Sequence, residues 1–166
     1  GYILYTTGLI YNLRNIETIA WTTLIFAIVL YISDKSRFDK KISTNLNIQS
    51  ILFIGIIQIL SLIPGVSRAG ITITAARILK FNRVDSSKIS FLLSIPALAG
   101  ASVLSLKDIF NQPTEFNYLV IIAIISSFIL SFLTVKYFLI FINKFSMNAF
   151  VIYRIIIALV LFGLIY

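Results

Sequence analysis

The sequence has no cysteine and no histidine, and it has little charge, with 12% charged residues and only six carboxylates. Without cysteine it forms neither disulfides nor thiolate metal sites. Without histidine it lacks the commonest general base and metal ligand, so acid or base chemistry must use the carboxylates or groups from elsewhere. Apolar residues are abundant instead, at 59% of the chain with a mean hydropathy of +1.00. This composition predicts an integral membrane protein.

The net charge of +8 comes from basic residues that flank apolar stretches. In a soluble protein such an excess would suit nucleic acid binding. Here its position indicates anchoring at the cytoplasmic face against anionic lipid, and we expect no nucleic acid partner.

Four stretches are long and apolar enough to cross a bilayer core of about 30 Å. They are residues 17–33, 86–106, 118–142 and 148–166, and residues 2–13 resemble the remnant of one more span. The sequence therefore predicts an all-α fold, a polytopic transmembrane helical bundle.

A fifth apolar region, residues 48–80, is interrupted at Pro64-Gly65. Proline lacks the amide donor and disfavours helix before it, while glycine relaxes the backbone. The two helical halves, about 16 and 14 residues long, are too short for a comfortable crossing. The region is therefore either one kinked span or two half-helices that enter and leave on the same side.

Basic residues on both flanks decide between these alternatives. They are Lys35, Arg37, Lys40 and Lys41 before the region, and Arg77, Lys80, Arg83 and Lys88 at its end. The positive-inside rule places both flanks in the cytoplasm, so 34–47 is a cytoplasmic basic loop and 48–80 a re-entrant hairpin. The hairpin tip, residues 64–68, then lies near mid-membrane.

Arg68 places a full charge at this tip, where a charged side chain persists only if it faces protein or a water-filled cavity and has a partner. No carboxylate is near it in sequence, so we expect a ligand anion. Gly65 and Gly70 allow close backbone approach, and Ser67 and Thr72 offer hydroxyls. With the helix N-terminus these groups suit a phosphate. The alternative is a helix cap at Ser67 with Arg68 extended to the cytoplasm.

Other polar residues in the apolar regions have plainer interpretations. Gln58, two turns before the tip, reaches either the same cavity or a neighbouring helix. Asp34 and Asp85 are interpreted as loop charges. Arg154, with Tyr153 beside it, is interpreted as an anchor that extends to the membrane interface.

The stretch "GIIQILSLIPGVSRAGITI" resembles a signature of the undecaprenyl-pyrophosphate phosphatase family, the bacitracin-resistance membrane phosphatases. That pattern is a glycine and a glutamine followed by Pro-Gly-x-Ser-Arg-Ser-Gly-x-Thr. Ala69 departs from it where the family has a second serine, which removes one hydroxyl. "FVIYRIII" is similar to the terminal Phe-x-x-Tyr-Arg element of the family. The residues that match the signature are Pro64, Gly65, Ser67, Arg68, Gly70 and Thr72.

The resemblance implies a multi-pass enzyme of the bacterial inner membrane, built from inverted repeats that each contain a re-entrant hairpin and three spans. Residues 48–166 match the second repeat, and 1–33 the last spans of a truncated first repeat. A glutamate-rich motif that uses a divalent cation, Mg or Ca, and a Gly-His element would belong to the missing N-terminal part. We therefore expect no metal ligands in this chain.

The implied reaction is hydrolysis of undecaprenyl pyrophosphate to the monophosphate carrier and inorganic phosphate, at a site that opens to the outer face. This recycles the carrier for cell-wall synthesis. Arg68 would clamp phosphate oxygens, Ser67 and Thr72 would donate hydrogen bonds, and Gly65, Gly70 and Gln58 would complete the phosphate site. Ser67 as a covalent nucleophile, a homodimer, a transporter of phosphorylated lipid and an inactive fragment stay open as alternatives.

Overall fold

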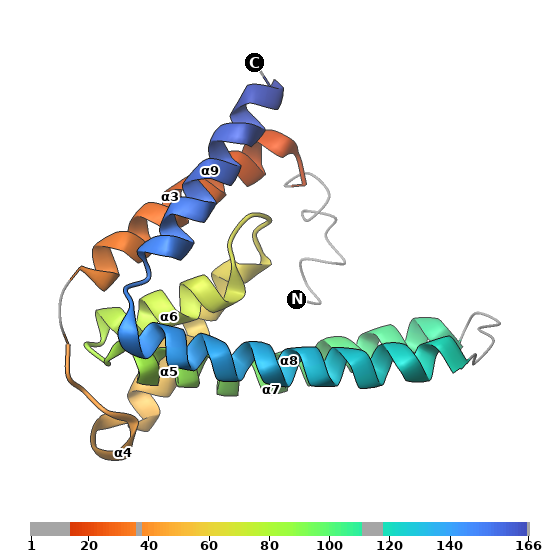
Figure 1. Cartoon of the computed structure of the whole chain (residues 1–166), viewed down its shortest axis with the longest axis horizontal. Coiled ribbons are helices and arrows are strands. Elements are labelled where there is room, and N and C mark those ends of the chain that lie inside the picture. The colour runs from red at the N-terminus through yellow and green to blue at the C-terminus, as the bar shows by residue number, and fades with distance from the viewer. Residues whose placement is uncertain (1–13, 36–37, 111–117, 166) are drawn as a thin grey trace. The chain divides into compact units, whose positions relative to one another are not determined.

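The computed structural model describes residues 14–35, 38–110 and 118–165 (Figure 1). These residues are almost entirely helical, and within them no strand is present beyond an isolated bridge between Lys40 and Phe81. The all-α prediction is confirmed for this part of the chain. The helices are α3 (Ile16–Asp34), α4 (Ile42–Asn45), α5 (Ile48–Ile57), the 3-10 helix η1 (Gln58–Leu62), α6 (Arg68–Ile78), α7 (Arg83–Phe110), α8 (Tyr118–Lys144) and α9 (Asn148–Ile165).

Four of these helices are long and apolar enough to cross a membrane, which confirms the prediction of a polytopic helical membrane protein. Large apolar side chains lie exposed along them, as on a lipid-facing surface. The remnant span at 2–13, Arg37 and most of the loop 107–117 lie outside the described residues. The candidate spans are Ile16–Asp34, Arg83–Val103, Val120–Lys144 and Asn148–Ile165.

The chain forms two compact units, 1–90 with 146–166, and 91–145. In the first, α3 packs against both α9 and α6, and α5 packs against α6. An edge-to-face contact between Trp21 and Phe162, with ring centroids 5.0 Å apart, joins α3 to α9. In the second, α8 pairs with α7 through a similar contact between Phe91 and Phe138 at 5.5 Å.

The region 48–80 folds as two short helical arms that pack on one another, with the chain reversed between η1 and α6 (Figure 1). The first arm consists of α5 followed directly by the 3-10 helix η1. Gly65 has a φ of +87°, and the Ser67 side chain caps α6 by accepting a hydrogen bond of 3.2 Å from the Gly70 amide. The arms thus have the form of a hairpin, while its re-entry into the bilayer and the inverted repeat stay predictions.

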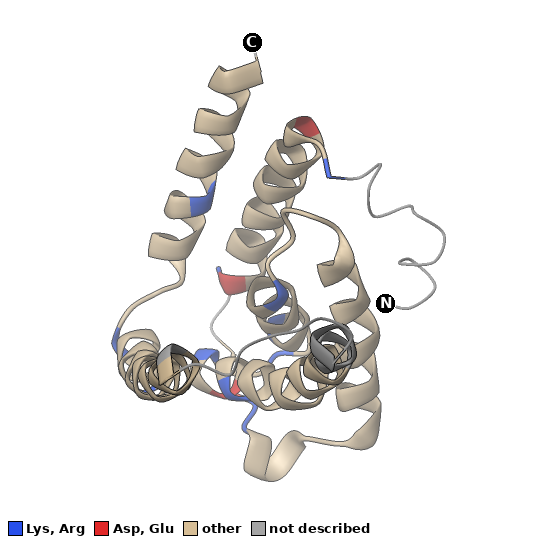
Figure 2. Cartoon of the chain, turned by 90° about the vertical axis from the view of Figure 1, so that its right-hand side faces the viewer, with Lys and Arg blue, Asp and Glu red and all other residues tan. Residues whose placement is uncertain are grey.

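Asp34 is a buried anchor between helix ends, and its interpretation as a loop charge is wrong. It is the last residue of α3 and only 2% exposed. Its Oδ1 lies 2.8 Å from Nε of Arg83 and 3.4 Å from Nε of Arg77, and its Oδ2 accepts from the amide of Met147 at 3.1 Å. Charged residues concentrate near helix ends in this way (Figure 2). The carboxylate is buried because two guanidinium groups and an amide replace its water.

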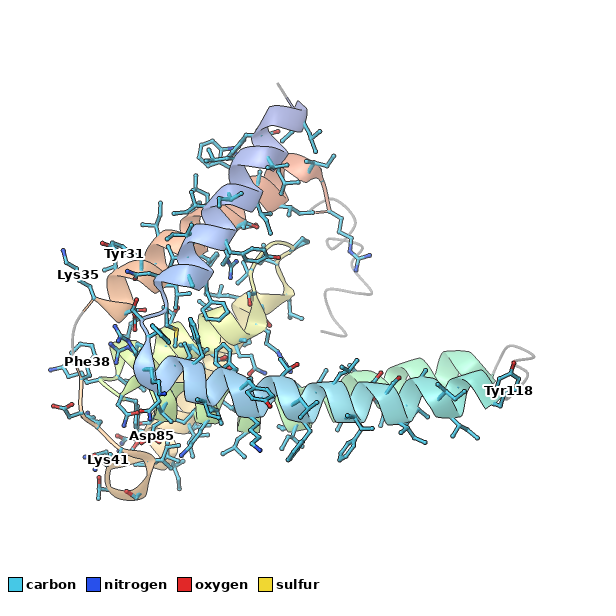
Figure 3. The ribbon with its side chains drawn as sticks, viewed as in Figure 1. Tyr31, Lys35, Phe38, Lys41, Asp85 and Tyr118 are labelled. Carbon is cyan, nitrogen blue, oxygen red and sulfur yellow. The ribbon has the colours of Figure 1, made fainter. Side chains whose placement is uncertain are left out.

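Asp85 likewise belongs to a helix, not to a loop. It lies in the first turn of α7, where its Oδ2 accepts from the Ile42 amide and from the Asn82 side chain, both at 3.0 Å. Lys41 precedes this contact, and Figure 3 shows it in the segment that leads to α4. Asp85 therefore ties the start of α7 to the connection that follows α3.

Candidate anion-binding site at the hairpin tip

The hairpin tip is positioned by side chains from α3 and α9 that donate to its carbonyl oxygens. Thr22 Oγ1 donates to the Pro64 carbonyl at 2.7 Å, and Thr23 Oγ1 to the Gly65 carbonyl at 3.3 Å. From the other side, Nη2 of Arg154 donates to the same Gly65 carbonyl at 2.8 Å. Partly buried backbone carbonyls at the break need such partners, because no helix supplies them there.

Two glycines allow this close packing. Gly65 adopts a positive φ, and a Cβ there would meet Thr22 Oγ1 and lie 2.7 Å from the Ile19 carbonyl oxygen. At Gly70 a Cβ would lie 2.9 Å from Nη1 of Arg154. The guanidinium group of Arg154 therefore rests directly against the opening turn of α6, and no larger residue than glycine leaves it room.

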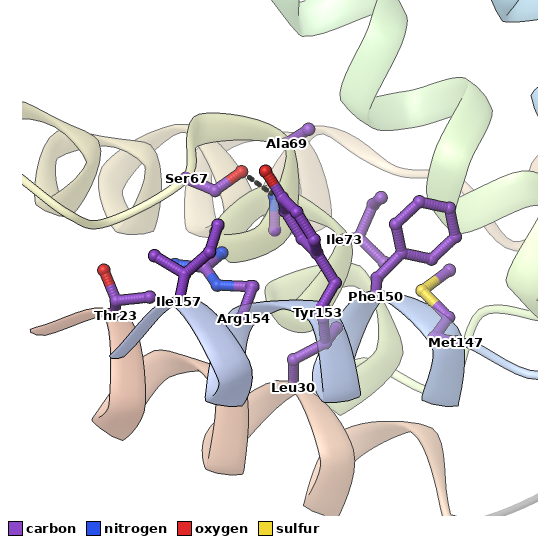
Figure 4. Close-up of a pocket in the computed structure, with 11 residues that line it drawn as sticks. Thr23, Leu30, Ser67, Ala69, Ile73, Met147, Phe150, Tyr153, Arg154 and Ile157 are labelled. Atoms are coloured by element: carbon purple, nitrogen blue, oxygen red, sulfur yellow. Dashed lines mark hydrogen bonds between the residues drawn. The ribbon is translucent and has the colours of Figure 1, made fainter. Parts of the chain in front are cut away.

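A cavity of about 290 Å³ opens beside this turn, between α3, α6 and α9 (Figure 4). Its polar groups gather where α6 begins, at Ser67, Gly70 and Arg154, and most of its remaining lining is apolar. The full lining is Thr23, Leu30, Ser67, Ala69, Gly70, Ile73, Met147, Phe150, Tyr153, Arg154 and Ile157. Positive charge, a hydroxyl and a helix N-terminus at one end of an apolar cavity suit the head of an amphiphilic anion.

The structure brings some of the predicted site residues to this cavity and not others. Ser67 and Gly70 line it, and Gly65 lies at the tip, with its carbonyl held by Arg154. Arg68 is the first residue of α6, partly exposed, and is not among the lining residues.

Thr72 also does not line the cavity, and the expectation that it shares a cavity with Arg68 finds no support in this geometry. Thr72 is 1% exposed, and its hydroxyl lies 2.6 Å from that of Ser90 on α7. The same hydroxyl donates to the carbonyl of Arg68 one turn back along α6 at 2.9 Å. The Thr72 hydroxyl is therefore already hydrogen-bonded to α7 and to its own helix.

Gln58 is the first residue of η1, and it too is absent from the cavity lining. Its Oε1 is buried and accepts no hydrogen bond from the residues that the structure describes. Gln58 therefore does not reach this cavity. No hydrogen bond from a neighbouring helix to its Oε1 is present within the described part of the chain.

Arg154 is the site residue that sequence reasoning missed, because its interpretation as an interfacial anchor is wrong. It is 9% exposed and directed to the hairpin tip, whereas its neighbour Tyr153 is 61% exposed. An arginine beside a tyrosine near the start of a span has the local pattern of an anchor. Only the match of "FVIYRIII" to a family element signalled another role.

No metal centre is assembled by the described residues, which contain no group of three or more histidine, cysteine or acidic side chains placed to hold an ion. Asp34 already forms ion pairs with two guanidinium groups. That the ligands of a divalent cation lie outside this chain stays a prediction.

The chain has several candidate spans and a broken hairpin whose tip contacts a buried arginine. These features define a polytopic membrane protein with a candidate anion site at a helix N-terminus. The chain belongs to the bacitracin resistance protein BacA family, whose model matches residues 2–160. This finding confirms the resemblance drawn from the hairpin sequence.

Several curated relatives carry the name undecaprenyl-diphosphatase. The protein from Pelagibacter ubique is 66% identical over 167 residues, which cover all of this chain and 65% of the relative. The protein from Elusimicrobium minutum is 43% identical over 148 residues, covering 89% of this chain and 56% of the relative. That from Alcanivorax borkumensis is 39% identical over 151 residues, covering 90% and 57%. The chain thus spans less than two thirds of the length of these relatives.

Proposed function

We propose that the full-length protein containing this chain is a membrane phosphatase of the bacterial inner membrane. It hydrolyses undecaprenyl pyrophosphate to the monophosphate carrier and inorganic phosphate, which returns the carrier to cell-wall synthesis. The observation that carries this proposal is the broken hairpin, whose tip carries the family signature and opens α6 beside a cavity with a polar end. The relatives named undecaprenyl-diphosphatase support it.

The chemistry fits the geometry because phosphoryl transfer depends mainly on positioning and on neutralising charge. Water adds to the terminal phosphorus, the bond from that phosphorus to the bridging oxygen breaks, and the lipid monophosphate leaves with the bridging oxygen. The dipole and the amides of the opening turn of α6 favour the charge that develops on the equatorial oxygens.

Individual residues have distinct roles in this scheme. Arg68, at the first position of α6, clamps phosphate oxygens, and Ser67 presents its hydroxyl at the cavity. Gly70 and Gly65 let the backbone approach the ligand and the tip pack closely. Thr72 supports α6 through Ser90, and its predicted hydrogen bond to phosphate would require it to leave that partner.

The apolar part of the cavity suits a substrate whose isoprenoid chain stays in the membrane. We place the site on the outer face, as the resemblance to the family implies. A homodimer stays a prediction.

The test is phosphate release by the purified full-length protein from undecaprenyl pyrophosphate in detergent with a divalent cation. We expect one inorganic phosphate and one lipid monophosphate for each substrate consumed. A folded protein that releases no phosphate, yet moves a phosphorylated lipid between the leaflets of a vesicle, would overturn the phosphatase proposal in favour of transport.

A further inference from the structure

The hairpin tip has the form of a type II β-turn over residues 63–66. The Val66 amide donates to the Ile63 carbonyl at 3.1 Å. Pro64 occupies the second position of the turn, and Gly65 occupies the third with a φ of +87°. A type I turn differs mainly in the direction of its central peptide, and it accepts proline and glycine at the same positions. The local sequence therefore permits both orientations of the Pro64-Gly65 peptide.

Thr22 on α3 selects one of these orientations. Its Oγ1 donates to the Pro64 carbonyl at 2.7 Å, and no other side chain in the described part of the chain donates to this central peptide. Thr23 and Arg154 donate to the Gly65 carbonyl, which belongs to the next peptide. In a type I turn the Pro64 carbonyl would point away from α3 and lose its hydrogen bond. The Thr22 hydroxyl therefore stabilises the type II form.

The same hydroxyl has two further acceptors in its own helix. Its oxygen lies 2.8 Å from the Thr18 carbonyl oxygen and 3.2 Å from that of Ile19. A threonine hydroxyl carries one proton, so it serves one main acceptor at a time. The two helix carbonyls also accept backbone amides of α3, whereas the Pro64 carbonyl has no such partner. The Pro64 carbonyl is therefore the acceptor that depends on Thr22.

The direction of this peptide decides where the Gly65 amide points. The described residues contain no cis peptide bond, so the Gly65 N–H points opposite to the Pro64 carbonyl and away from α3. No described residue accepts a hydrogen bond from it. It lies three residues before the start of α6, whose first amides have no acceptor within the helix. Backbone N–H groups gathered at a helix start favour an anion.

We propose that Thr22 is a positioning residue for the proposed phosphatase reaction. Its hydroxyl fixes the Pro64-Gly65 peptide in the type II orientation, so that the Gly65 amide joins the opening amides of α6 in binding the phosphate oxygens of the transition state. A side chain on α3 thus orients a donor on the hairpin, 42 positions further along the chain. This inference rests on the proposed function.

Alanine and serine at position 22 isolate the hydroxyl, because these two side chains differ by one oxygen atom. Thr22→Ala removes the donor and, unlike valine, places no methyl group against the Pro64 carbonyl, whereas Thr22→Ser keeps the donor. Phosphate release by the full-length protein is measured below the melting temperature of each variant. We expect Thr22→Ala to lower kcat by about tenfold or more with little change in KM, since a donor to the transition state is misplaced. Thr22→Ser should restore kcat.

Ser33→Ala is the matched control on α3, because the Ser33 hydroxyl donates to the Leu30 carbonyl of its own helix at 2.8 Å. It should leave kcat as in the wild type. Equal kcat values for Thr22→Ala and Thr22→Ser would overturn the inference, as would an equal loss in Ser33→Ala. Should Thr22→Ala not fold, Thr22→Cys replaces it, because a thiol is a weak donor. A kcat equal to that of Thr22→Ser would then refute the inference.

The proposed function can fail separately. If the wild type releases no phosphate, the phosphatase proposal fails. Orthovanadate, which mimics the five-coordinate transition state of phosphoryl transfer, then serves as the probe through the rise in melting temperature that it causes. A smaller rise in Thr22→Ala than in Thr22→Ser supports the positioning role, and an equal rise overturns it. If the wild type releases phosphate and Thr22→Ala matches it, the inference fails alone.

Discussion

Replacing Gly65 with alanine tests the architecture of the hairpin tip. The φ of +87° disfavours any residue with a Cβ, at a cost of about 1–2 kcal/mol. The added methyl group meets Thr22 Oγ1 and the Ile19 carbonyl, and such overpacking costs about 1–3 kcal/mol more. Alanine also restricts the unfolded chain, which offsets about 0.4–1 kcal/mol. We expect a net loss of about 1–5 kcal/mol for Gly65→Ala.

The assay is the melting temperature of the full-length protein in detergent, together with phosphate release. Gly55→Ala is the matched control, because Gly55 lies in α5 and a Cβ there would have nothing within 4 Å. Alanine favours a helix interior by about 0.5–1 kcal/mol, so this control should melt at or slightly above the wild-type temperature. Gly65→Ala should melt lower and lose activity, because the tip and the start of α6 shift. A Gly65→Ala protein as stable and active as the control would refute the reasoning.

Three further predictions concern the surroundings of the site. Asp34→Asn leaves the buried Arg77 without its neutralising charge and should destabilise the protein by about 3–5 kcal/mol, visible as a lower melting temperature; an unchanged one would contradict the anchor role. Thr72→Val should destabilise by about 1–3 kcal/mol by leaving the hydroxyl of Ser90 unpaired, and adding Ser90→Ala should recover part of this. Loss of activity without loss of stability would instead favour phosphate binding by Thr72. Trp21, 50% exposed on α3, should be quenched by brominated lipid chains once tryptophans outside this chain are replaced; absence of quenching would contradict a lipid-facing α3.

Local sequence features predicted much of the fold. Long apolar runs located the four candidate spans to within a few residues, because helix length and hydropathy act within one segment. Pro64-Gly65 located the break, since proline removes an amide and Gly65 takes a positive φ. Ser67 was recognisable as a helix cap, and its hydroxyl does accept from the Gly70 amide.

The contacts that build the site could not be predicted in this way, because they join distant residues. Arg154 donates to a carbonyl 89 positions away, and Asp34 meets Arg83 across 49 positions. Each charged residue, taken alone, has the pattern of an interface or loop position. Only the packing of α3 against α9 and α6 shows that they are buried.

The most direct test of the central claim compares phosphate release from undecaprenyl pyrophosphate by the full-length protein with that by Arg68→Ala. Lys144→Ala is the control, since Lys144 is an exposed cation at the end of α8. If the hairpin tip performs phosphoryl transfer, release falls at least about a hundredfold in Arg68→Ala, as when one charge-stabilising donor is removed. Release in the control should match the wild type. Equal release by Arg68→Ala and the wild type would contradict the account.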